Sequence, residues 1–127
     1  MRNRVGGVHK VVATVAKEAA GQLYETVMGD NVIYTEWKRQ NPNMNAKQLE
    51  KRFIDKNWGK CIEFARATLS LMLNNHSLPE KVREDIYEAL VLDNTLVVGR
   101  KSPAEAKFLL SQQSQQLVNE IRKGTLN

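Results

Sequence analysis

The sequence predicts an all-α protein, a single small bundle of about five helices. Apolar residues recur at spacings of three and four over several long stretches, the periodicity of an amphipathic helix. A serine or asparagine three residues before a glutamate or glutamine, a helix-start signal, precedes three of these stretches. With 127 residues, 42% hydrophobic and 26% charged, the chain is long enough for one core, so residues 1–127 are expected to form one domain.

Residues 58–73 are predicted to be the central helix of the bundle. Apolar side chains occupy most of the circumference of this helix, which indicates that other helices cover it on several sides. Its inward face is expected to comprise Trp58, Cys61, Ile62, Ala65, Leu69, Met72 and Leu73, widened by Phe64, Thr68 and Leu71.

The N-terminal part of the chain divides into two segments. Residues 1–7, with two arginines and a Gly-Gly pair, are predicted to be a mobile basic arm. Residues 8–28 carry an apolar stripe at helical spacing, and this helix is expected to end at Gly29. Its many alanines would allow a neighbouring helix to approach closely. The stripe suits a bundle helix, and contact with a membrane surface or a second subunit stays open.

The region before the central helix holds one ambiguous segment and one clear start signal. Residues 32–40 suit either a strand or a short helix, and the spacing of Ile33 and Trp37 favours the helix. Residues 41–45 have the composition of a loop. Asn45 and Gln48 form a capping-box pair before a helix over 46–57, and Gly59 is expected to kink the junction with 58–73 or to separate the two by a turn.

Two further capping boxes predict the last two helices. Ser77 and Glu80 mark the start of an acidic helix that ends near Asp93. Residues 95–98 are β-branched or apolar and suit an extended connector or an edge strand. Ser102 and Glu105, with a proline between them, start a helix over 103–123 that is followed by glycine.

Charge is distributed unevenly along the chain, whose net charge is +5. Residues 38–66 carry eight basic and three acidic side chains, whereas residues 80–93 carry five acidic and two basic ones. Such polarity suits binding of a polyanion, or assembly of copies that join basic face to acidic face. The candidate polyanion-binding residues are Lys38, Arg39, Lys47, Lys51, Arg52, Lys56 and Lys60.

The terminal helix has a thin apolar seam flanked by glutamine and serine. A seam of this kind suits contact with a neighbouring subunit as well as it suits an exposed terminal helix. Together with the stripe of residues 8–28, it supplies the candidate oligomer contacts Val12, Val15, Ala19, Leu23, Leu110, Leu117 and Ile121.

No motif for catalysis or cofactor binding is recognisable. The single cysteine, Cys61, lies on the apolar face of the central helix and is expected to be a core residue. His9 and His76 form no metal-ligand spacing, and phosphate-binding glycine loops and nucleophile motifs are lacking. No apolar run is long enough to span a bilayer. We therefore expect a non-enzymatic protein without cofactor, metal or membrane span.

Two segments resemble small structural proteins of tailed-bacteriophage particles. These are Tyr34–Asn43 and Arg52–Lys60, in a short, basic, helical chain with a glutamine-rich tail. The resemblance implies a homo-oligomeric virion component, such as a portal–tail adaptor or an internal head or ejection protein, found in the virion or in the host cytoplasm before assembly. Its partners would be itself, other structural proteins and DNA. A small nucleic-acid-binding regulator that uses the basic region 38–66 is the alternative.

Overall fold

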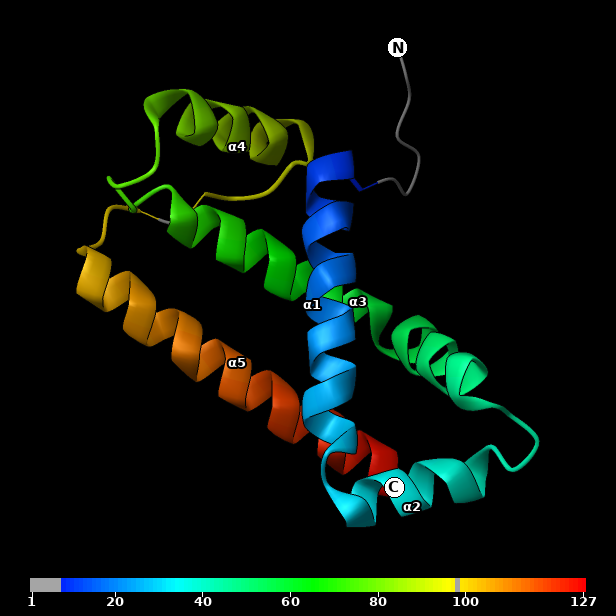
Figure 1. Ribbon diagram of the computed structural model, residues 1–127. Coiled ribbons are helices and arrows are strands. Elements are labelled where there is room, and N and C mark those ends of the chain that lie inside the picture. The colour runs from blue at the N-terminus through cyan, green and yellow to red at the C-terminus, as the bar shows by residue number, and fades with distance from the viewer. Residues whose placement is uncertain (1–7, 98) are drawn as a thin grey trace.

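Five α-helices make up the fold of the described residues. The computed structural model describes residues 8–97 and 99–127, so the predicted arm at residues 1–7 lies outside the described residues. Within the described ranges there is no strand, and residues 95–97 form a connector. The predicted all-α bundle is confirmed. In chain order the helices are α1 (Lys10–Met28), α2 (Asn31–Gln40), α3 (Ala46–Met72), α4 (Glu80–Leu92) and α5 (Pro103–Leu126) (Figure 1).

The ambiguous segment at residues 32–40 is a helix, α2. Its start is stabilised by Asp30, whose carboxylate accepts hydrogen bonds from the backbone N–H groups of Val32 (2.9 Å) and Ile33 (3.3 Å). A carboxylate at this position satisfies donors that have no partner within the helix. Gly29 at the end of α1 and Asp30 at the start of α2 are therefore adjacent residues.

The predicted helices over 46–57 and 58–73 are one continuous helix of 27 residues, α3. The expected capping box at its start is confirmed, since Asn45 and Gln48 each bond the other's backbone N–H. No turn separates the halves, and Gly59 lies within the helix. One glycine lowers helix propensity by only about 1 kcal/mol, which packing on both sides overcomes.

Two predicted helix ends need correction. Ser77 does not cap α4: its own N–H donates to the Asn75 side chain at 3.0 Å, which holds the loop in a turn until Pro79, and the helix then starts without a side-chain cap. Ser102 does cap α5, by accepting from the Glu105 N–H at 3.1 Å. That helix runs past Gly124 to Leu126, because Thr125 is buried and donates to the Ile121 carbonyl at 2.8 Å.

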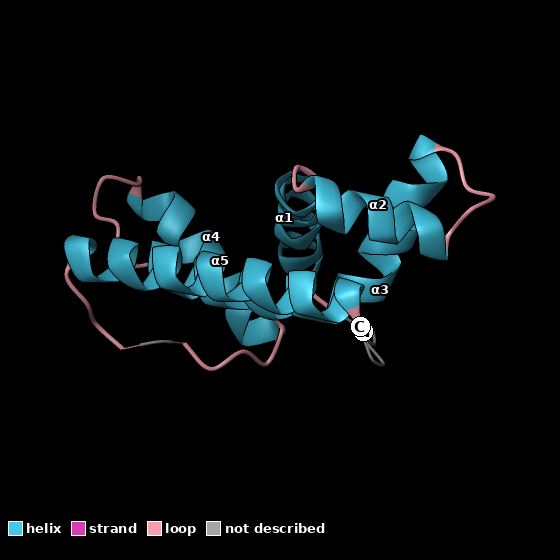
Figure 2. Ribbon diagram, turned by 90° about the horizontal axis from the view of Figure 1, so that it is seen from below, coloured by secondary structure: helices cyan, strands magenta, loops and turns pink. Residues whose placement is uncertain are grey.

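Helix α1 lies across one face of the layer formed by α3 and α5, which run antiparallel to each other (Figures 1 and 2). It contacts all four other helices, whereas α3, which contains most of the predicted centre at residues 58–73, packs mainly against α1, α4 and α5. The crossing is possible because Ala16 and Ala20, both fully buried, keep the helices close. The organising role is therefore shared between α1 and α3.

The core extends along the whole bundle. At the α2 end, the buried Trp37 packs edge to face against Phe53 and donates its indole N–H to the Leu49 carbonyl at 3.2 Å. Toward α4, the fully buried Cys61 belongs to the same cluster, as expected for a packing residue. Among the described residues, no helix combines the length and apolar character needed to cross a membrane.

Candidate interaction groove between α1 and α3

The seven predicted polyanion-binding residues do not share one face. Only Lys47 and Lys51 line the surface groove between α1 and α3. Lys38 lies over the ring of Tyr34 and Lys56 over that of Trp37, with the ammonium nitrogen 4.9 and 5.4 Å from the ring centre.

The other three basic residues have separate surroundings. Arg39 forms an ion pair with Glu36 at 2.6 Å, and this pairing lowers the pKa of the Glu36 carboxyl to about 2. Lys60 borders a small hollow between α3 and α5. Arg52 is exposed on α3.

The groove lies where α1 and the first half of α3 diverge, and its volume is about 1190 Å³. Each wall is one helical stripe, because residues three or four apart lie above one another on a helix. Helix α1 supplies Lys10, Ala13, Thr14 and Lys17, and α3 with its cap supplies Asn45, Lys47, Gln48, Glu50, Lys51, Ile54, Asp55 and Trp58.

The lining combines apolar side chains with lysines from both helices. Ala13, Ile54 and Trp58 are half-buried and provide the apolar surface. Four lysines against Glu50 and Asp55 leave a net charge of +2. Lys51 pairs with Asp55 at 2.9 Å, but both side chains are more than half exposed, so this bond contributes little to stability. Sequence reasoning missed α1 as the second wall, since Lys10 and Lys17 looked like ordinary solvent-facing lysines.

The outer face of α4 also combines apolar and charged side chains, but its charge is mainly acidic where that of the groove is mainly basic. Tyr87 and Val91, four residues apart, are 53% and 50% exposed. Beside them runs an acidic row of Glu80, Glu84 and Glu88, and the half-buried Arg83 lies on the same surface. The sequence indicated the acidic helix, and the structure adds the apolar pair left uncovered next to it.

The predicted oligomer contacts serve mainly as the chain's own core. Val12, Ala19, Leu23, Leu117 and Ile121 are each at most 9% exposed, so they leave no surface for a neighbouring subunit. The reason is that α5 packs along α1, α2 and α3, which turns its seam inward. Val15 and Leu110 are half-buried. The large apolar side chains of α5 that do face outward are Phe108, at 60% exposure, and Leu126, at 49%.

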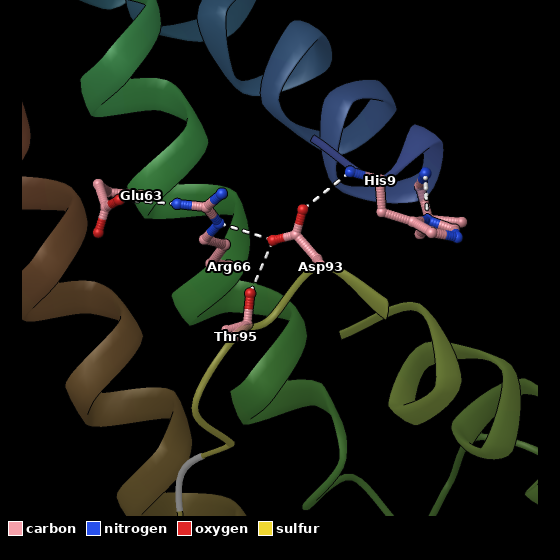
Figure 3. A network of polar contacts seen from close by, with 6 residues as sticks. His9, Glu63, Arg66, Asp93 and Thr95 are labelled. Atoms are coloured by element: carbon pink, nitrogen blue, oxygen red, sulfur yellow. Dashed lines mark hydrogen bonds and ion pairs between the residues drawn. The ribbon is translucent and has the colours of Figure 1, made fainter. Parts of the chain in front are cut away.

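A buried carboxylate links three helices at the end of the molecule near α4 (Figure 3). One oxygen of Asp93 accepts from the His9 N–H at 2.8 Å, and the other accepts from Arg66 and Thr95, both at 2.7 Å. Arg66 also pairs with Glu63. Burial by itself would raise the pKa of Asp93, but the three hydrogen bonds and the Arg66 charge outweigh it and hold the pKa below its usual range.

This Asp93 network has a structural character, because the side chain of Asp93 is fully buried and its hydrogen bonds join residues at the start of α1, in α3 and at the end of α4. Sequence reasoning placed Asp93 near the end of a helix and missed its partners, which lie 27 and 84 residues away for Arg66 and His9. Asn94, which follows Asp93, has a left-handed φ of 58°, as is typical of the residue after a helix end. An asparagine at this position is a local signal for the end of the helix, but it does not indicate the distant partners of Asp93.

Other reactive groups are separated from one another. The Cys61 thiol is fully buried, and burial raises its pKa. His9 Nδ1 accepts the Val11 N–H at the start of α1, and His76 Nδ1 lies 3.0 Å from the Arg83 guanidinium. Within residues 8–97 and 99–127, no three potential metal ligands gather.

The α1–α3 groove and the outer face of α4 are therefore the candidate functional surfaces. Both present apolar side chains next to charged ones. Comparison with protein-family models, with curated proteins and with solved structures finds no match for this chain.

Proposed function

We propose that the protein is a non-enzymatic structural or assembly protein that forms homo-oligomers through direct protein–protein contacts. The observation that carries the proposal is the α1–α3 groove, where half-buried apolar side chains lie between lysines contributed by two helices. A groove of this kind accepts an amphipathic helix, whose apolar side chains enter it while charged ones meet the rim.

The exposed apolar side chains on the opposite part of the molecule support the same proposal. Tyr87, Val91 and Leu92 are each at least 50% exposed although α4 buries other residues in the core. A small chain that leaves adjacent apolar residues uncovered gains free energy when a partner covers them, at about 25 cal/mol per Å² of buried apolar area.

Sedimentation velocity over a range of protein concentrations tests the self-association. We expect the average mass to rise above that of the 14.5 kDa chain as concentration increases, and to fall when salt is added, because the groove's net charge is screened. A single 14.5 kDa species at every concentration in low salt would refute the proposal.

The particle that we propose for this assembly is a tailed-bacteriophage virion, as a portal–tail adaptor or an internal head or ejection protein. The support is the resemblance of residues 34–43 and 52–60 to structural proteins of such particles. Mass spectrometry of purified virions from a phage that encodes the chain tests the assignment. Detection at stoichiometric copy number would support it, and absence from the particles would contradict it.

Polyanion binding is the second candidate function, because the groove gathers Lys10, Lys17, Lys47 and Lys51 from two helices. Fluorescence anisotropy with labelled duplex DNA in low salt tests it. The double variant Lys10→Glu with Lys47→Glu should lose binding, whereas Lys107→Glu with Lys123→Glu, an equal charge change on exposed residues of α5, should retain most of it. Equal loss in both variants would mean that net charge, and not the groove, binds DNA.

A further inference from the structure

The α1–α3 groove has a shape and charge that specify what it binds. Its lysines lie in pairs on the two walls, Lys10 with Lys17 on α1 and Lys47 with Lys51 on α3. At 1.5 Å per residue, the α1 pair spans about 10 Å along the helix axis. An occupant that satisfies these side chains needs a row of acidic groups of similar length next to an apolar row.

The outer face of α4 has these two rows. Glu80, Glu84 and Glu88 span about 12 Å along the helix axis. Tyr87 and Val91 form the adjacent apolar row, and both are half exposed. With Arg83 included, this face has a net charge of −2, which matches the +2 of the groove lining in magnitude and opposes it in sign.

We infer that α4 of one copy docks in the α1–α3 groove of a second copy, with Tyr87 and Val91 against the apolar lining and the glutamates toward the lysines. This inference rests on the proposed self-assembly and names its contact. The helix-in-groove arrangement buries the apolar side chains that each copy alone leaves exposed. Opposite charges on the two surfaces fix the register and speed the encounter.

The two surfaces cannot meet within one molecule. Helix α4 lies on one side of α1, and the first half of α3, which forms the groove wall, lies on the other (Figures 1 and 2). Because the surfaces differ, the contact is head to tail: of two joined copies, one retains a free groove and the other retains a free α4 face. Such a contact generates a ring if its rotation closes, or an open filament if it does not.

Charge reversal on each surface in the full-length protein tests the contact. The groove variant is Lys10→Glu with Lys47→Glu, and both changes place an acid in the first turn of a helix, where the helix dipole favours it. The α4 variant is Glu84→Lys with Glu88→Lys. The control, Glu18→Lys with Glu25→Lys, makes the same charge change as the α4 variant, on exposed residues of α1 outside the groove. Circular dichroism verifies that every variant is folded.

The expected result by sedimentation velocity has two parts. Each surface variant alone should associate at least about tenfold more weakly than the wild type, since like charges then face each other, and the control should associate as the wild type does. An equimolar mixture of the two surface variants should associate again, because the basic groove of one meets the acidic α4 of the other, and the reversed pair also matches.

Each other outcome overturns the inference in a recognisable way. A wild type that stays monomeric refutes the proposed self-assembly and this contact together. Surface variants that assemble like the wild type refute the α4–groove contact while self-assembly stands. Variants that are weakened alone and stay weak in the mixture show that the two surfaces do not meet.

Discussion

Replacing Asp93 is the most informative test of how the helices are held together, because its buried carboxylate links three of them. Asp93→Ala removes the acceptor of three hydrogen bonds, from the His9 N–H, Arg66 and Thr95, at 2.7 to 2.8 Å. These bonds connect the start of α1, the C-terminal third of α3 and the end of α4. Their loss should therefore lower the stability of the whole bundle.

The magnitude follows from how much water each donor reaches once the carboxylate is gone. A hydrogen bond to a charged group contributes about 1.5–3 kcal/mol, and a donor left buried costs more than one that water can reach. His9 and Thr95 are half-buried, and the Arg66 side chain is 28% exposed, so all three can be partly rehydrated. We expect a loss of about 3 kcal/mol from a total of roughly 6–19 kcal/mol for a chain of this length.

Urea unfolding followed by far-ultraviolet circular dichroism measures this loss. The control is Asp85→Ala, which removes an exposed ion pair with Lys81 at 3.1 Å and should change the free energy of unfolding by less than about 0.5 kcal/mol. If Asp93→Ala and Asp85→Ala cost the same within error, the Asp93 network does not hold the helices together and the reasoning is wrong.

Four further measurements test the remaining structural conclusions. Because the fold lowers the pKa of Asp93, the contribution of its carboxylate to the free energy of unfolding is fully present above the unfolded pKa of about 4 and is lost as pH falls through the folded pKa. The difference in free energy of unfolding between wild type and Asp93→Asn should therefore become smaller on acidification. A difference that stays constant with pH would contradict this expectation. Gly59→Ala should stabilise the protein by up to about 1 kcal/mol, since an added Cβ meets no atom within 4 Å, and a lower melting temperature would show that the glycine is required. Asn45→Ala should cost about 1 kcal/mol through loss of the α3 cap, and an unchanged urea midpoint would contradict that. Cys61 should react with a thiol reagent only as fast as the protein opens, because it is fully buried and its pKa is raised; fast labelling of the native state would refute its burial.

Local signals predicted the helices well where side chain and backbone interact over a few residues. The Asn45–Gln48 capping box and the Ser102 cap involve partners three residues apart, so sequence spacing was sufficient to find them. The prediction that Ser77 caps α4 was wrong because of an equally local interaction: the Ser77 N–H donates to the Asn75 side chain two residues away, and this bond forms a turn instead. Where two local interactions compete, spacing alone does not identify the winner.

Residues of the candidate site were predicted on one wall and missed on the other. Lys47 and Lys51 were expected to act together, and the structure places both in the groove. Lys10 and Lys17 join them because α1 crosses α3, an arrangement that depends on the packing of the buried Ala16 and Ala20 and not on the lysines themselves. For the same reason Leu117 and Ile121, expected to meet a neighbouring subunit, face the chain's own core.

The sequence by itself determined that this protein is helical, where most of its helices begin, and that its charge is divided between a basic and an acidic region. Those properties arise from periodicity and capping, which act within a few residues. Only the tertiary structure decided that 46–72 is one helix, that Asp93 joins residues 27 and 84 positions away, and that a groove faces outward beside α1. Such features depend on which helices cross and at what face, and this is set by packing energy summed over the whole core.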